Sequence, residues 1–117
     1  MNKLLHTPLT VHNVELANRL VMPPMATGKT PDGTVQDDLL AYYDARSKGG
    51  CIGLIVTEHA YVSPDGKAHE GQLSVSRDTD IPGLTKLVET IHKNNTRVIA
   101  QINHAGSAAM EEITGYP

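Results

Sequence analysis

The chain lacks most features that mark secreted, membrane-spanning or nucleic-acid-binding proteins. It has one cysteine, Cys51, so it forms no internal disulfide and fits a reducing compartment. No stretch approaches the roughly 18 apolar residues of a membrane span, and no signal-peptide pattern opens the sequence. The net charge is −3 and the lysines and arginines are scattered, which provides no basic patch for nucleic acid or an anionic membrane. We therefore expect a cytoplasmic protein with a small-molecule substrate and with neither nucleic acid nor membrane as a partner.

Aromatic residues are also scarce, with four tyrosines and no phenylalanine or tryptophan. A core must then be built from valine, isoleucine, leucine, methionine and alanine, the residues that dominate the interior of parallel sheets. The 117 residues suffice for one domain with a real core.

Short apolar runs alternate with helical patterns along the chain. A β-hairpin is expected over residues 8–17, with His12-Asn13 as its turn. Buried strands are expected near 19–23, 51–57 and 97–102, and helices over 34–50 and 81–95. Because strands and helices alternate, the fold class is α/β with a parallel sheet.

Local signals refine the ends of these elements. Thr34 is expected to cap the first helix and Asp80 the second, because short polar side chains accept hydrogen bonds from free helix N–H groups. Cys51 is expected to be a small core residue at the start of the second strand. Residues 61–78 and the segment after the third strand are expected to be irregular.

The polar residues of interest follow the predicted strands directly. In parallel α/β folds the chemistry lies at the carboxyl ends of the strands. Here those ends are "PPMATG", "TEHAY" and "QINHAG", where small residues let a ligand approach the backbone. A ligand site is therefore expected at this edge of the sheet.

Three segments, "NRLVMPPM", "GGCIGLIVTEHAYVSPDGK" and "IAQINHAG", together resemble the Old Yellow Enzyme family of FMN-dependent NAD(P)H oxidoreductases. The resemblance covers the whole chain. It implies a (β/α)₈ barrel, a fold of about 250 residues, so the chain corresponds to its N-terminal part only. It also implies FMN as cofactor, NAD(P)H as reductant, and hydride transfer from reduced flavin to an activated alkene such as an enone or a dienoyl thioester.

A second possibility is a non-catalytic α/β module that only assembles with other polypeptide. Three strands of an eight-stranded barrel expose sheet edges and apolar rows. On either view we expect a homo-oligomer or a self-associating chain, and the 117 residues alone are expected to be inactive.

The resemblance also implies which residues meet the flavin. The implied cofactor-binding residues are Pro23, Pro24, Met25, Ala26, His59 and Gln101. Ala26 would direct its peptide N–H toward N5 or O4 of the flavin, and Gln101 would pair its amide with the pyrimidine edge. His59 would contribute mainly its main chain. From the residues alone, Gln101 could equally bond to a neighbouring loop.

Other polar residues are expected to have structural roles. Glu58 is interpreted as a paired buried acid, with acid–base catalysis as the alternative, and His104 as a residue that fixes its loop. The histidines show no metal-ligand spacing, so no metal site is expected. The resemblance places the catalytic residues beyond residue 117. Ala26 and Ser107 depart from the threonine or cysteine and the arginine of many relatives.

Overall fold

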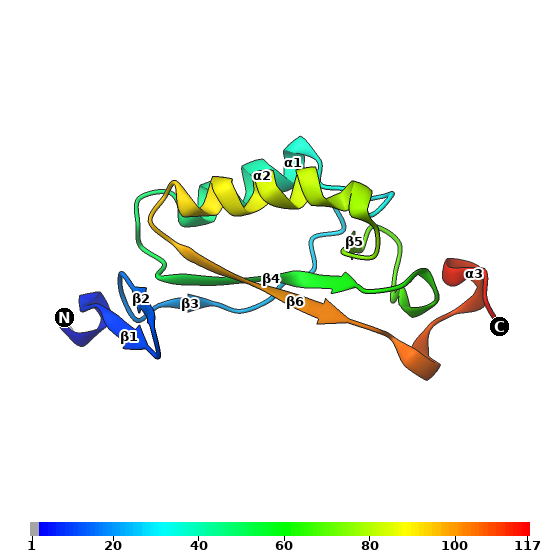
Figure 1. The fold of residues 1–117 in the computed structure, drawn as a ribbon, viewed down its shortest axis with the longest axis horizontal. Helices are drawn as coiled ribbons and strands as arrows, with labels where there is room; N and C mark the ends of the chain where they lie inside the picture. The colour runs from blue at the N-terminus through cyan, green and yellow to red at the C-terminus, as the bar shows by residue number, and fades with distance from the viewer. Residues whose placement is uncertain (1–2) are drawn as a thin grey trace.

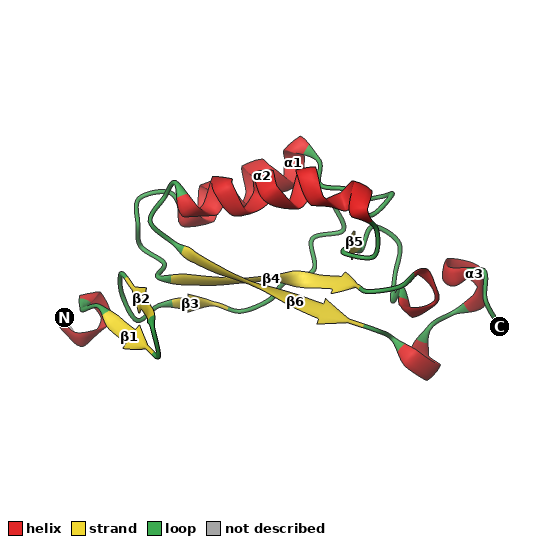
Figure 2. Ribbon diagram, viewed as in Figure 1, coloured by secondary structure: helices red, strands yellow, loops and turns green. Residues whose placement is uncertain are grey.

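The computed structural model describes residues 3–117 as two layers, a pair of helices packed on one face of a small sheet (Figure 1). The helices are α1 (Asp37–Ser47) and α2 (Ile81–His92). Their apolar sides meet the sheet at Ile55, and the buried core consists of Leu39, Tyr43, Ile55, Ala60, Leu73, Leu87 and Ile91. The opposite face of the sheet carries no helix (Figure 2).

The sheet is parallel and is organised around β4 (Leu54–Tyr61). β6 (Arg97–Asn103) pairs along one edge of β4. On the other edge, β3 (Val21–Met22) pairs with the beginning of β4 and β5 (Leu73–Ser74) pairs with its end. The α/β class with a parallel sheet is confirmed. β5 was not predicted, because two residues are too short to show a period of their own.

The N-terminal hairpin lies at the end of the sheet where the parallel strands begin (Figure 1). β1 (Leu9–Val11) and β2 (Val14–Leu16) pair antiparallel across a turn in which His12 has a φ of 58°. Arg97 donates its Nε–H to the carbonyl of Glu15 at 3.1 Å, which attaches the hairpin to β6.

The predicted caps are wrong at both helices. α1 begins after Gln36 without a side-chain cap, because Thr34 is bound instead to Asp32, whose carboxylate accepts both its N–H (3.0 Å) and its Oγ1–H (2.6 Å). Asp80 does occupy the N-cap position of α2, but its side chain makes no capping hydrogen bond. Its carboxylate accepts hydrogen bonds from Ser74 Oγ (2.6 Å) and Arg77 Nη2 (2.8 Å).

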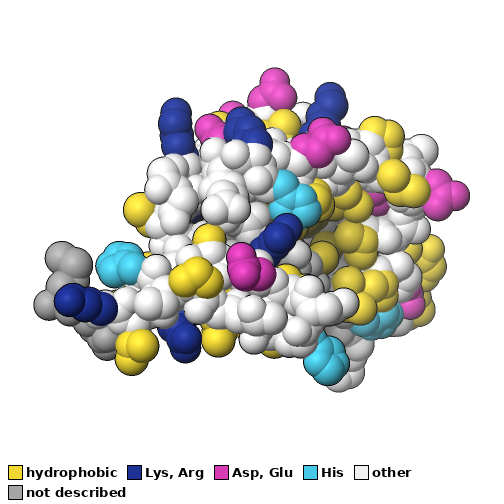
Figure 3. Space-filling view, turned by 60° about the vertical axis from the view of Figure 1, so that its left-hand side comes forward, with side chains coloured by type: hydrophobic (Ala, Val, Ile, Leu, Met, Phe, Trp, Pro, Cys, Tyr) yellow, Lys and Arg dark blue, Asp and Glu magenta, His cyan; other side chains and the backbone are white. Residues whose placement is uncertain are grey.

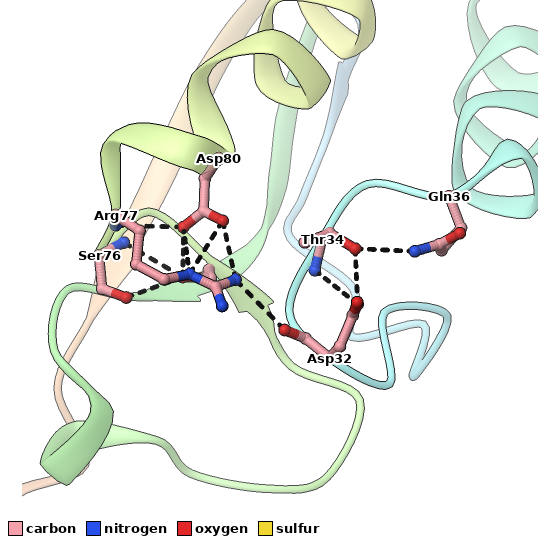
Figure 4. Close-up of polar contacts among 7 residues, drawn as sticks. Asp32, Thr34, Gln36, Ser76, Arg77 and Asp80 are labelled. Carbon is pink, nitrogen blue, oxygen red and sulfur yellow. Dashed lines mark hydrogen bonds and ion pairs between the residues drawn. The ribbon is translucent and has the colours of Figure 1, made fainter.

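These two turns are joined to each other. The Arg77 guanidinium that binds Asp80 also donates to the Asp32 carbonyl at 3.3 Å, so the turn before α1 and the turn before α2 form one polar network (Figure 4). The network lies at the amino-terminal ends of both helices, where it binds the side chains that were expected to cap them.

Three further expectations are corrected by the structure. Cys51 is exposed rather than buried, because β4 begins only at Leu54 and Cys51 lies in the link that follows α1. Residues 61–78 contain β5 and a 3₁₀ turn at Pro64–Gly66. The segment after β6 forms a 3₁₀ turn, Gly106–Ala108, and a short helix α3, Glu111–Thr114.

The helix-free side of the molecule exposes apolar residues. Ile99 is 53% exposed and Val21 is 51% exposed. On the opposite, helical face, Ile102 at the end of β6 is 68% exposed. Figure 3 shows hydrophobic side chains gathered in the right half of that view, whereas charged side chains of both signs lie along its top. Among residues 3–117, no helix is long and apolar enough to cross a membrane.

Asn18 clamps the beginnings of β3 and β4 together. Its buried side chain accepts the Leu20 N–H at 2.9 Å and donates to the Gly50 carbonyl at 3.1 Å. Gly53 lies directly against the Asn18 carbonyl, with no room for a side chain. The asparagine of the Asn-Arg signature thus has a structural explanation, because its side chain holds the beginning of β3 to the segment that leads into β4.

We expect Gly53→Ala to lower the free energy of unfolding by about 1–3 kcal/mol, the usual cost of overpacking against a backbone that cannot move freely. Gly83→Ala is the matched control. Its new methyl would meet only the Val35 side chain at 3.0 Å, and alanine favours the helix of α2. Urea unfolding of both variants measures the difference. Equal stabilities would contradict the role given to the Asn18 clamp.

Candidate functional site

The six residues implied to meet a flavin all lie at the carboxyl ends of three neighbouring strands. The segment Pro23–Ala26 follows β3, His59 lies near the end of β4, and Gln101 lies on β6. Because parallel strands end at the same edge of a sheet, the structure brings these segments to one side of the molecule. Met25 is 54% exposed, and His59 is half-buried.

His59 and Gln101 are direct partners in the β4–β6 ladder. Paired residues of adjacent strands project on the same face of the sheet. Val56 and Ile99 form the preceding pair on that face, and Ile55 and Val98 alternate with them on the helical face, where they belong to or pack against the core. The His59 and Gln101 side chains therefore project from the helix-free face.

Two polar groups at this edge have no partner inside the described chain. Within residues 3–117, neither the Ala26 N–H nor the Gln101 side-chain amide makes a hydrogen bond to protein. A free main-chain donor beside a small side chain suits the edge of a planar ring that accepts hydrogen bonds, and a primary amide suits a ring edge with alternating N–H and C=O groups. The residues present thus fit the isoalloxazine of FMN.

A β-bulge shapes the centre of β4. Val56 pairs with Ile99 and His59 pairs with Gln101, so two residues of β4 oppose Ala100 alone. Such a bulge leaves a backbone group outside the ladder. Here the Glu58 N–H donates to the Tyr43 hydroxyl of α1 at 2.8 Å, and this hydroxyl faces the Glu58 Oε1 at 3.3 Å.

The Glu58 carboxylate connects the bulge to the loop after β3. It is 1% exposed and accepts the Thr27 Oγ1–H at 3.0 Å and the Thr27 N–H at 3.5 Å. Burial raises the pKa of Glu58, and the hydrogen bonds from Thr27 and Tyr43 oppose that rise. A carboxylate enclosed in this way anchors the segment that contains Ala26.

A second contact fixes the same loop further on. Thr30 donates its buried Oγ1–H to the Gly71 carbonyl at 2.7 Å, and Gly71, with a φ of 72°, lies against the backbone of Gly28. The segment from Ala26 to Thr30 is thus attached on both sides, and the backbone donors at its beginning are preorganised.

Two histidines form a pair next to this loop. The Nε2 atoms of His59 and His69 lie 2.9 Å apart, and His69 Nδ1 lies 2.6 Å from the Glu70 carbonyl. Burial and the neighbouring His69 ring lower the pKa of His59. Sequence reasoning selected His59 but missed its contact with His69, because the nine residues between them show no period that predicts it.

His104 lies away from the face of Gln101. Its Nδ1 accepts the Gly106 N–H at 3.0 Å, and its Nε2 lies 3.5 Å from Asp65. The ring packs on Gly66, where a side chain would collide with it. These contacts agree with a loop-fixing role. In the part of the chain that the structure describes, no group of three potential ligands could hold a metal ion.

Sequence reasoning also missed Thr27 and Tyr43. The one available signal was Glu58 itself, an acidic residue inside an apolar strand, because a buried carboxylate needs hydrogen-bond donors. The helical pattern around Tyr43 predicts that this residue lies on the apolar side of its helix, but it does not predict which group the hydroxyl contacts. That partner depends on how the helix packs on the sheet.

Known proteins resemble this chain in both sequence and fold. The family model of the NADH:flavin oxidoreductase / NADH oxidase family matches residues 4–115. An NADH oxidase of Thermoanaerobacter brockii is 40% identical over 89% of this chain, and an NADH:acrylate oxidoreductase of Vibrio harveyi is 42% identical over 87% of it. The solved structure of Old Yellow Enzyme from Pichia sp. AKU4542 superposes on 97% of the chain with a TM-score of 0.87 and 30% identity.

The chain spans only part of each of these proteins, namely 16% of the NADH oxidase, 10% of the acrylate oxidoreductase and 30% of the Old Yellow Enzyme chain. The structural neighbours are (β/α)₈ barrels, to which β3, β4, β6 and the two helices correspond. The predicted resemblance is confirmed, and FMN and NAD(P)H are the cofactor and reductant of the family.

We expect Tyr43→Phe to lower the free energy of unfolding by about 1–3 kcal/mol, because it leaves the buried Glu58 N–H without an acceptor. Tyr42→Phe is the matched control on the same helix, since the Tyr42 ring contacts Arg46 and its hydroxyl makes no hydrogen bond within residues 3–117. Thermal unfolding of the two variants tests this. Equal losses would show that the hydroxyl of Tyr43 does not support the bulge.

Proposed function

The chain belongs to the NADH:flavin oxidoreductase / NADH oxidase family, and on that premise we propose that it forms the flavin-facing part of an FMN-dependent NAD(P)H oxidoreductase. In this proposal further polypeptide supplies the remaining strands of the barrel. The complete enzyme passes hydride from reduced flavin to an activated alkene.

One observation carries the proposal. The two unpartnered polar groups, the Ala26 N–H and the Gln101 amide, lie at the same carboxyl edge, and the latter projects from the face without helices. Both residues are exposed, so these groups are accessible to a ligand. Their free hydrogen-bonding capacity is what a planar heterocyclic ligand requires.

When bound, FMN supplies the hydride chemistry, and the protein supplies position and electrostatics. Pro23 and Pro24 end β3 because proline cannot donate to the ladder, and they direct the chain along the edge. Ala26 then offers a main-chain donor where negative charge develops, without reorganisation of the loop. Thr27, bound to Glu58, keeps that donor in place.

The substrate is proposed as an activated alkene. The relative from Vibrio harveyi is named for acrylate, an alkene conjugated to a carboxylate. We extend to this chain only the class, an electron-poor carbon–carbon double bond such as that of an enone or a dienoyl thioester. The residues that activate it are proposed to come from the later strands.

We expect Gln101→Leu to weaken FMN binding by about 5- to 150-fold, which corresponds to ~1–3 kcal/mol for leaving a polar ring edge unpaired. The measurement is fluorescence titration of FMN with a polypeptide that includes the whole barrel. Gln36→Leu is the control, because Gln36 is exposed at the start of α1 and bonds only to Thr34. Unchanged FMN affinity in Gln101→Leu would contradict the placement of the flavin.

The alternative, a non-catalytic assembly module, is favoured by one observation, the exposed apolar residues Ile99, Ile102 and Val21 beside open strand edges. We expect the 117-residue chain on its own to self-associate, to bind FMN weakly and to show no NAD(P)H oxidation. Sedimentation velocity and an FMN-supplemented NADH assay test this. A stable monomer that retains yellow FMN and turns over would contradict both the self-association and the need for further strands.

A further inference from the structure

The hydrogen-bond partners of the histidine pair determine where its protons lie. A carbonyl oxygen only accepts, so His69 Nδ1, at 2.6 Å from the Glu70 carbonyl, must carry a proton. In the uncharged pair His69 Nε2 is then an acceptor. The proton between the two Nε2 atoms, which lie 2.9 Å apart, therefore belongs to His59.

This assignment leaves the free lone pair of the uncharged pair on His59 Nδ1. Within residues 3–117, His69 is the only hydrogen-bond partner of the His59 ring. The other three ring nitrogens already hold or share a proton, so an added proton binds at His59 Nδ1. This holds whichever of the two rings then carries the positive charge. Protonation of the pair converts one atom, His59 Nδ1, from acceptor to donor.

A second proton is strongly disfavoured. Two charged imidazoles would direct two N–H groups at each other across the 2.9 Å contact. The pKa of His59 is lowered by burial and by the neighbouring His69, in agreement with this repulsion. The geometry of this contact therefore allows the pair one added proton and not two.

The charged groups around the pair are engaged with other partners, so the exchangeable proton stays on the histidines. On the same strand, Glu58 interacts electrostatically with His69 and is itself enclosed by Thr27 and Tyr43. On the loop, Lys67 and Glu70 bind each other at 3.5 Å.

The elements next to the pair add little charge. On β6 the neighbouring side chains, Gln101 and Asn103, are uncharged. The loop after β3, which packs on Gly71 through Gly28, carries Lys29 as the one charged side chain of residues 26–30.

We propose that His59 and His69 form a one-proton site, with the exchangeable proton on His59 Nδ1, that responds to the negative charge of reduced flavin on the same face. The proposal rests on the proposed function, because it takes the flavin to lie on the face of His59 and Gln101. When the flavin becomes reduced and anionic, an N–H bond forms at His59 Nδ1 with a proton from solvent. That proton returns to solvent on reoxidation, and no electrons pass through the rings.

The first test uses the 117-residue chain without flavin, labelled with ¹⁵N-histidine. Above the titration of the pair, NMR should show a pyrrole-like Nδ1 on His69, a pyrrole-like Nε2 on His59 and a pyridine-like Nδ1 on His59. On acidification both rings should shift in one common step. His69→Ala should return His59 to a mixture of tautomers, and His92→Gln, at the end of α2, should change neither ring. Two independent steps, or a pyridine-like His69 Nδ1, would overturn the one-proton site.

The second test uses the FMN-loaded barrel. The flavin reduction potential should fall more steeply with rising pH in the wild type than in His59→Gln over the range in which the pair titrates. Parallel curves, with FMN bound in both proteins, would overturn the coupling and leave flavin binding intact. If Gln101→Leu also left FMN affinity unchanged, that result would show that the coupling fails because the flavin lies elsewhere. The NMR test, which needs no flavin, would then still decide whether the one-proton site itself is correct.

Discussion

The hydrogen bond from the Glu58 N–H to the Tyr43 hydroxyl is the contact on which the arrangement of the site depends. A bulge in a central strand is stable only if its unpaired backbone group finds a partner, because a buried donor without one costs free energy. α1 supplies that partner from the helical layer. The same hydroxyl lies near the Glu58 carboxylate, which in turn fixes Thr27. Helix packing, strand geometry and the loop after β3 are thus linked through one side chain.

The sequence predicted the larger features for physical reasons that operate locally. Apolar runs rich in branched residues mark β4 and β6, and the 3.6-residue period marks α1 and α2. The caps could not be predicted, because Asp32 and Asp80 have competing partners, and Arg77 unites them across 45 residues. Cys51 was assigned to the core because apolar letters continue to it, whereas the strand begins three residues later.

The candidate site shows the same division. The family resemblance implied Pro23, Pro24 and Gln101, the strand-end rule for parallel folds indicated the same edge of the sheet, and the structure brings these residues to that edge. The contacts of Glu58 with Tyr43 and of His59 with His69 depend on distances between elements, which no local pattern encodes. The exposure of β6 could not be predicted for a similar reason. The apolar pattern indicates that a residue favours burial, but it does not indicate which neighbouring element covers it.

The bulge also decides which side chain projects from the helix-free face beside Gln101. Side chains alternate between the two faces of a strand, so one additional residue exchanges the faces of everything that follows. In a regular β4, residue 58 would pair with Gln101, and a carboxylate would face the ligand. With the extra residue, the carboxylate is turned aside and an imidazole takes its place. A regular β4 with every residue retained would therefore replace a neutral or cationic side chain on the helix-free face by an anionic one and would move Ala60 out of the core, whereas deletion of Thr57 would remove the bulge and keep His59 opposite Gln101.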